Sequence, residues 1–169
     1  SEIMLQQTQV QIVIPYYLNW IEKYPNIKIL QKETIDNLLL TWQGLGYYKR
    51  VQNILSTAKI IVKQYNGQFP NQYDDLIKLH GIGDYTASMI LSIAFNHNEY
   101  VPIDGNIKRI MSRLHAMPVA RQTLKNYKKY TKKYIDFYYP GDSIQALMDL
   151  GREVCKPQSP NCTACPLRQ

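Results

Sequence analysis

Apolar residues recur at helical spacing through most of the chain, and we find no convincing strand pattern or sequence repeat. The spacing predicts a helix from Ser1 to Tyr24, in which Pro15 is a kink or a boundary. Thr34 is a candidate N-cap for a short helix. Further helices are predicted over 50–65, 73–79, 84–95, 106–116, 121–139 and 143–154, with breaks at Pro118 and at Pro140-Gly141. Short helices with short loops predict an all-α fold of roughly eight to ten helices.

The turn between two of these predicted helices reads Leu79-His80-Gly81-Ile82-Gly83. Glycine has no Cβ, so such a turn can be tight and can approach a phosphodiester, while the next helix presents free N–H groups. This helix-hairpin-helix pattern predicts a phosphate grip that does not read base identity. The simpler alternative is an αα-hairpin whose glycines only cap a helix.

Charge and aromatic content favour a nucleic-acid partner. The chain of 169 residues has a net charge of +7 and 14 tyrosines, more than its tryptophans and phenylalanines together. A protein that is merely basic is the alternative. There is no apolar run long enough to span a membrane and no signal peptide, so we expect a cytoplasmic, nucleoid-associated protein. Because the chain begins inside helical sequence without a methionine, we expect residues to precede it.

Two carboxylates are candidates for chemistry, although each also has an ordinary interpretation. Asp104 stands at a predicted helix start, where aspartate is a preferred N-cap. Glu2 lies near another helix start, where glutamate is usually solvent-exposed. Glycosidic cleavage needs one acid to protonate the leaving group and a second carboxylate to stabilise the sugar cation. Glu2 and Asp104 fill these roles only if the fold brings them to one cleft.

Three further side chains suit contact with a distorted duplex. Tyr47 follows a Gly-Leu-Gly turn, and an aromatic ring on such a loop can wedge between base steps. Gln6 and Gln7 adjoin Glu2, and a glutamine can fill the gap left by a flipped base. Taken alone, they are more simply a core tyrosine and two surface glutamines.

The three cysteines lie in the last fifteen residues as Cys155-x6-Cys162-x2-Cys165. A clustered, odd number without a secretory signal favours metal ligation over disulfides. A four-thiolate site needs one more ligand, which a continued x5 spacing would place at the second position beyond Gln169. Zinc is the alternative to an iron–sulfur cluster.

Taken together, these segments closely resemble the MutY-type adenine DNA glycosylases of the endonuclease III-like helix-hairpin-helix superfamily. The matching segments are SEIMLQQTQV, WQGLGYYKRVQN, LHGIGDYTASMILS, VPIDGNIKR, ALMDLGREVC and the cysteine-containing tail. The resemblance implies a two-lobed fold, with a helical-barrel lobe at 7–100 that holds the hairpin at about 73–95. A second lobe is expected at 101–169, joined by residues 1–6 and carrying an iron–sulfur loop at 155–169.

The resemblance also implies roles for three residues of the reaction. Glu2 matches the acid that protonates N7 of adenine and later activates water, which requires burial to raise its pKa. Asp104 matches the aspartate that stabilises or traps the sugar cation. Tyr85 stands where relatives that also cut the strand carry a Schiff-base lysine, so a monofunctional glycosylase is expected.

The remaining matches concern DNA and the cofactor. The resemblance places Gln7 and Tyr47 in the duplex around the lesion, the hairpin glycines on phosphate, and Lys108 near the site without a required role. Three of the four ligands of a [4Fe–4S] cluster match Cys155, Cys162 and Cys165. The departures are His80 in place of a common proline, the missing fourth cysteine, and no C-terminal domain for 8-oxoguanine.

The expected substrate is double-stranded DNA with adenine opposite 8-oxoguanine or guanine, acted on by a monomeric catalytic-core fragment. Two alternatives remain open. One is a bifunctional glycosylase and lyase for oxidised pyrimidines, against which Tyr85 argues. The other is a helix-hairpin-helix DNA-binding module without catalysis.

Overall fold

The computed structural model describes residues 1–118 and 122–168, and its regular structure over these residues is entirely helical. The prediction of an all-α fold is therefore confirmed. The chain divides into two compact units, Ser1–Ala87 and Ser88–Gln169, each of which is described by itself. None of the described helices is long and apolar enough to cross a bilayer.

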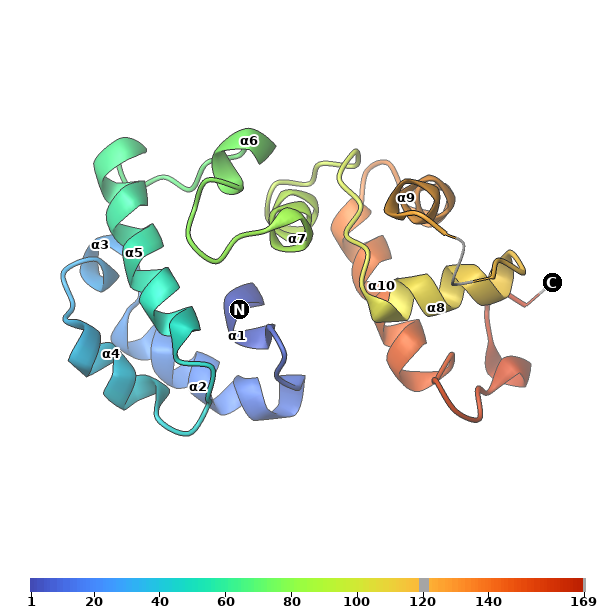
Figure 1. The fold of residues 1–169 in the computed structure, drawn as a ribbon, viewed down its shortest axis with the longest axis horizontal. Helices are drawn as coiled ribbons and strands as arrows, with labels where there is room; N and C mark the ends of the chain where they lie inside the picture. The colour runs from blue at the N-terminus through green and yellow to red at the C-terminus, as the bar shows by residue number, and fades with distance from the viewer. Residues whose placement is uncertain (119–121, 169) are drawn as a thin grey trace. The chain divides into compact units, whose positions relative to one another are not determined.

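The first unit is a layered set of short helices around an aromatic and aliphatic core. Its helices are α1 (Glu2–Leu5), α2 (Val10–Lys23), α3 (Ile27–Leu30), α4 (Ile35–Trp42), α5 (Lys49–Gln64), α6 (Tyr73–Leu76) and the start of α7 (Asp84–Ala94) (Figure 1). Helices α3 and α4 pack against α5, and α2 packs against α4 and α1. The Trp20 ring meets the Trp42 ring edge to face, with centroids 5.6 Å apart. Thr34 caps α4 by accepting a hydrogen bond from the Asn37 amide.

The second unit is built on the amphipathic helix α8 (Gly105–Leu114). Around it lie α9 (Leu124–Thr131), the 3-10 helix η2 (Lys132–Tyr134), α10 (Pro140–Glu153) and the 3-10 helix η3 (Cys162–Ala164) (Figure 1). The apolar side of α8 packs on α9 and α10, with Ile107 and Met111 fully buried. Arg121, where a helix was predicted to begin, lies outside the described residues.

Several predicted element boundaries are wrong. The helix predicted from Ser1 to Tyr24 is two helices, and the break lies at residues 6–9, with Pro15 accommodated inside α2. The backbone turns because Gln7 adopts a left-handed conformation with φ of 57°. Pro140 begins α10 rather than preceding it, since the first helical position needs no backbone N–H.

The division into units also differs from the lobe boundaries expected from sequence. The structure divides inside α7, between Ala87 and Ser88, and residues 1–6 belong to the first unit. Residues 1–6 belong to the first unit because the Arg50 guanidinium donates to the main-chain carbonyls of Met4 and Gln6.

Candidate functional site

The hairpin turn between α6 and α7 contains two glycines that the fold treats differently. Gly81 has φ of 80°, and a Cβ added there would lie 2.9 Å from the Asn53 amide nitrogen. At Gly83 an added Cβ meets no atom within 4 Å, and its φ lies outside the left-handed region. Leu79 and Ile82 anchor the turn in the core, with 3% and 4% of their surface exposed. Packing therefore requires the first glycine, whereas open space lies beside the second.

This contrast predicts that alanine at the two positions has separable effects. We expect Gly81→Ala to lower Tm by several degrees, because a left-handed alanine costs about 1–2 kcal/mol and the Cβ clashes with Asn53. We expect Gly83→Ala to leave Tm unchanged and to weaken duplex DNA binding. Thermal unfolding and fluorescence anisotropy on the same variants measure both. Unchanged duplex affinity of Gly83→Ala would contradict phosphate binding at this turn.

Polar side chains stabilise the hairpin turn by donating hydrogen bonds to its main-chain carbonyls. The Gln6 amide nitrogen donates to the Gly81 carbonyl at 3.0 Å and to the Thr86 hydroxyl at 3.2 Å. The Thr57 hydroxyl donates to the His80 carbonyl at 3.0 Å. Gln6 thus links the end of α1 to the hairpin, and its role as a duplex-contacting residue stays a prediction.

Gln7 and Tyr47, the two residues expected to enter the duplex, share an uncommon backbone conformation. Their φ angles are 57° and 48°, in the left-handed region that residues with a side chain seldom occupy. Both are exposed, and 58% of the Tyr47 surface is accessible. Strained conformations persist where surrounding contacts impose them, and they concentrate at functional sites.

The contacts that impose both conformations converge on Arg50, which is only 5% exposed. Its guanidinium donates to the carbonyls of Met4 and Gln6, just before Gln7. The other guanidinium nitrogen donates to the carbonyls of Leu45 and Gly46, at 3.4 and 3.3 Å, just before Tyr47. The guanidinium carbon also lies 5.2 Å from the Tyr47 ring centroid. One buried cation therefore fixes the bases of both exposed loops.

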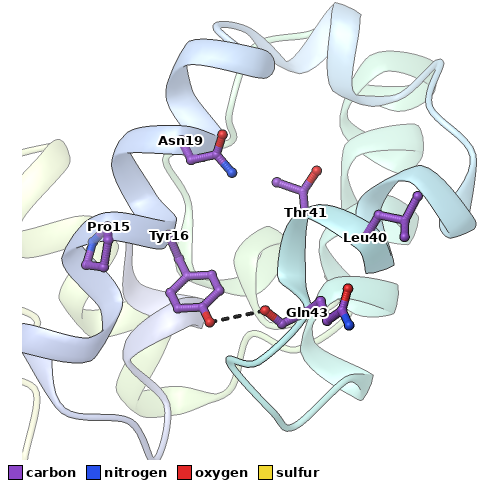
Figure 2. A pocket seen from close by; sticks show the side chains of 6 residues that line it. All are labelled: Pro15, Tyr16, Asn19, Leu40, Thr41 and Gln43. Atoms are coloured by element: carbon purple, nitrogen blue, oxygen red, sulfur yellow. Dashed lines mark hydrogen bonds between the residues drawn. The ribbon is translucent and has the colours of Figure 1, made fainter.

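The Tyr47 loop is supported on its other side by α2. The Tyr16 hydroxyl points toward Gln43 and donates to its carbonyl at 3.1 Å (Figure 2). A Cβ at Gly44, where φ is 94°, would lie 2.5 Å from that hydroxyl. The open hollow beside Tyr16, lined also by Pro15 and Leu40, holds none of the predicted site residues. This hollow therefore lies behind the Tyr47 loop and is not the candidate functional site.

Glu2 begins α1 and is half-buried. Burial raises the pKa of its carboxyl above the ordinary glutamate value. A weak hydrogen bond from the Ser1 hydroxyl, at 3.4 Å, opposes that rise. A carboxyl with a raised pKa holds its proton to higher pH and can donate it. The expectation that burial raises the pKa of Glu2 is confirmed.

Asp104 is the N-cap of α8. One carboxylate oxygen accepts from the Ile107 amide at 2.7 Å, and the other accepts from the Asn106 side-chain amide at 3.0 Å. Both bonds fix the orientation of the carboxylate at the helix N-terminus. The cap interpretation from sequence is therefore correct, and the same geometry keeps the carboxylate at a fixed position.

The Asp104 carboxylate is connected through Asn106 to the start of the cysteine-containing loop. Arg109 donates to the Asn106 side-chain oxygen at 2.8 Å, to the Gly151 carbonyl at 2.7 Å and to the Cys155 carbonyl at 2.8 Å. Gly151 is required, because a Cβ there would lie 2.8 Å from Cβ of Asn106. The orientation of Asp104 thus depends on α10 as well as on α8.

The predicted site residues fall into two groups by unit. Glu2, Gln6, Gln7, Tyr47, Gly81, Gly83 and Tyr85 lie in the first unit, and Asp104, Lys108, Cys155, Cys162 and Cys165 lie in the second. Tyr85 is the second residue of α7 and is half-buried, and no primary amine stands at this position. The Lys108 amide donates to the Asp104 carbonyl at 3.0 Å in the first turn of α8.

The cysteines are soft metal ligands, but their side chains do not converge on one point. All three are free thiols, and among the described residues no group of three His, Cys, Asp or Glu side chains is arranged to hold an ion. Arg113 donates to Sγ of Cys155 at 3.4 Å and to the carbonyls of Lys156 and Pro157. The three thiols do not converge in the described part of the chain, and we derive no catalytic step from a cluster.

Sequence reasoning missed the residues that position the others. Arg50 stands on the apolar side of α5, beside Val51 and Leu55, and a charge on a buried face is a usable signal. Asn106 and Arg109 follow Asp104 on α8, but no sequence pattern shows that they reach it or the carbonyl of Gly151.

Comparison with known proteins gives a family match and close relatives. The model of a family described as "HhH-GPD superfamily base excision DNA repair protein" matches residues 1–135. A protein named adenine DNA glycosylase from Buchnera aphidicola is 44% identical over 99% of this chain. A protein of the same name from Arabidopsis thaliana is 42% identical, also over 99%. The chain spans 48% and 30% of the lengths of these two relatives.

The fold also matches solved structures. A non-covalent endonuclease III–DNA complex aligns with a TM-score of 0.84 at 26% sequence identity. The alignment covers 98% of this chain and 77% of the other. The two-unit helical architecture therefore belongs to a fold that includes enzymes solved on DNA.

Proposed function

The chain belongs to the HhH-GPD superfamily of base excision DNA repair proteins, and on that basis we propose that it is the catalytic core of an adenine DNA glycosylase. The observation that carries this proposal is the 44% identity to a protein of that name along 99% of the chain. Its substrate is duplex DNA with adenine opposite 8-oxoguanine or guanine, and it acts as a monomer.

The two carboxylates divide the reaction between them. The protonated Glu2 carboxyl donates its proton to N7 of a flipped adenine, and the bond between C1′ and N9 breaks with its electron pair moving to the base. The cation at C1′ is stabilised or covalently trapped by ionised Asp104. The Glu2 carboxylate then takes a proton from water, whose oxygen adds to C1′. The products are free adenine and an abasic site.

Contacts with the duplex come from the first unit. Backbone amides at Gly81 and Gly83 hold a phosphate, and Tyr47 and Gln7 enter the stack around the lesion. The support for this assignment is the left-handed backbone of both inserting residues and their common anchor, Arg50. Lys108 lies near Asp104 and has no required role in base removal.

A bifunctional glycosylase and lyase for oxidised pyrimidines is the alternative reaction. It needs an amine that attacks C1′ and forms a Schiff base. The corresponding residue is Tyr85, whose hydroxyl cannot form that intermediate. We therefore propose a monofunctional enzyme.

A [4Fe–4S] cluster is the cofactor that the resemblance implies. Cys155, Cys162 and Cys165 would supply three of its four ligands, and it would order the loop that follows α10. Iron and inorganic sulfide measured on the purified chain test this proposal. Less than one iron per chain in anaerobically prepared protein would contradict it.

The activity assay compares three duplexes under single-turnover conditions. We expect adenine release opposite 8-oxoguanine and opposite guanine, and none of thymine glycol from the third duplex. Strand breaks should appear only after alkali, because hydrolysis leaves an intact abasic strand. Borohydride trapping as efficient as that of a true lyase would refute the monofunctional mechanism. Binding of all three duplexes without base release would indicate a DNA-binding module.

A further inference from the structure

Positive charge is concentrated in one segment of the second unit. Residues 124–139, which include α9, η2 and the loop before α10, contain five lysines and one aspartate, a net +4 of the chain's +7. Lys125, Lys128, Lys129 and Lys132 have the spacing of one helix face. Within residues 1–118 and 122–168, no carboxylate forms an ion pair with Lys125, Lys129 or Lys132.

The opposite face of this segment is anchored by tyrosines. Tyr127 is buried and its hydroxyl lies 2.9 Å from that of Ser112. The Tyr134 hydroxyl lies 3.2 Å from Nε2 of His115, and the Tyr130 ring lies 4.6 Å from the His115 ring. The anchored tyrosines hold the lysine face toward solvent.

Three consecutive aromatic residues follow the lysines and remain exposed. Phe137, Tyr138 and Tyr139 have 70%, 71% and 65% of their surface accessible. The Phe137 and Tyr138 rings meet edge to face, with centroids 5.2 Å apart. Lys133 and Phe137 are four positions apart, so their backbones lie at most about 14 Å from one another. Contiguous exposed aromatics are uncommon on a monomer and mark interaction surfaces.

The aromatic loop is held in place by hydrogen bonds rather than by burial of its rings. The Asp136 carboxylate accepts from the amides of Tyr138 and Tyr139 at 2.8 and 3.0 Å. The Asn96 amide donates to the Tyr138 carbonyl at 2.8 Å, and the Ser143 hydroxyl accepts from the Asp136 amide at 2.9 Å. These bonds fix the backbone of the loop, while its aromatic rings remain exposed.

We propose that residues 124–139 form a binding surface for single-stranded DNA. The lysine face supplies the charge complement of a phosphate chain, and the exposed rings supply stacking partners for unpaired bases. The rings discriminate between partners, because a paired duplex buries the base faces that they would stack on. This surface acts in addition to the hairpin and does not depend on adenine removal.

The first test separates the lysine face from net charge. The double variant Lys125→Ala/Lys129→Ala is compared with Lys32→Ala/Lys63→Ala, which removes two exposed lysines of the first unit and reaches the same net charge. Anisotropy of a labelled oligothymidylate is measured as a function of salt. We expect the first variant to reduce the slope of log affinity against log salt by about 1.4, since each phosphate contact contributes about 0.7 on single strands. The control variant should keep the wild-type slope.

The second test isolates stacking. The wild-type protein should bind oligothymidylate on the order of tenfold more tightly than a strand of the same length made of abasic sites. Phe137→Ala/Tyr138→Ala should lose that difference and keep wild-type affinity for duplex DNA. Both side chains are mostly exposed, so Tm should change little.

Three results would overturn the proposal. One is an equal loss of slope in the two lysine variants. Another is equal wild-type affinity for base-containing and abasic strands. The third is a wild-type response in the aromatic variant combined with loss of self-association or of binding to anionic vesicles, which would assign the surface to a second copy or to a membrane.

Discussion

Glu2→Gln is expected to reduce the single-turnover rate of adenine release by at least about 1000-fold while leaving duplex affinity within a few-fold of wild type. Glutamine keeps the size and polarity of the side chain but has no proton of suitable acidity for N7, and it cannot activate water afterwards. Quench-flow or manual single-turnover assays on adenine opposite 8-oxoguanine measure the rate, and anisotropy measures the affinity.

The matched control is Glu22→Gln, which makes the same chemical change at an exposed carboxylate of α2. It should keep the wild-type rate. If Glu2→Gln also kept that rate, Glu2 would not be the acid. If it lost rate and affinity in equal proportion, Glu2 would contribute to binding rather than to proton transfer.

The pH dependence follows from the same carboxyl. Because burial raises the pKa of Glu2, its protonated form persists above the pH at which an exposed glutamate ionises. Base release should therefore fall as pH rises through that raised pKa, and the residual rate of Glu2→Gln should lack this decline.

The raised pKa of Glu2 also sets the direction in which the free energy of unfolding changes with pH. A carboxyl whose pKa is raised on folding binds its proton more tightly in the folded state, so unfolding free energy falls as pH rises from the ordinary glutamate pKa to the raised one. At neutral pH, Glu2→Gln removes a buried charge, and its Tm should equal or exceed that of the wild type.

The sequence predicts structure correctly where interactions between residues close in the chain determine it. Thr34 begins α4 because its hydroxyl satisfies a helix N-terminus, and Asp104 does the same for α8. The hairpin glycines and the amphipathic α5 were also readable. The break at Gln6–Gln9 was not, because the left-handed Gln7 depends on a residue more than forty positions away. Long-range hydrogen bonds to main-chain carbonyls leave no periodic signal.

That distant residue, Arg50, carries the second large prediction. Its guanidinium binds carbonyls just before Gln7 and just before Tyr47, so it acts on DNA only through those two residues. Arg50→Met keeps the length of the side chain and removes the donors, which costs about 1–3 kcal/mol for each carbonyl that is left without a partner. We expect Tm to fall by roughly 10 °C. At a temperature where the variant is folded, we expect adenine release to slow by more than about 100-fold.

Two companion variants separate positioning from simple destabilisation. Arg50→Lys retains the charge but replaces the planar fork, so it should recover part of the lost stability without restoring both loops. Lys49→Met removes the neighbouring exposed cation and should leave Tm unchanged. The decisive readout is the stacking of Tyr47 and Gln7 in the duplex, reported by 2-aminopurine fluorescence next to the lesion. If Arg50→Met lost stability but kept the wild-type fluorescence change and rate, Arg50 would serve folding alone. A lost fluorescence change in folded Arg50→Met, with the rate reduced in parallel, would establish that one buried guanidinium sets both inserting side chains, because it donates to carbonyls just before each of them.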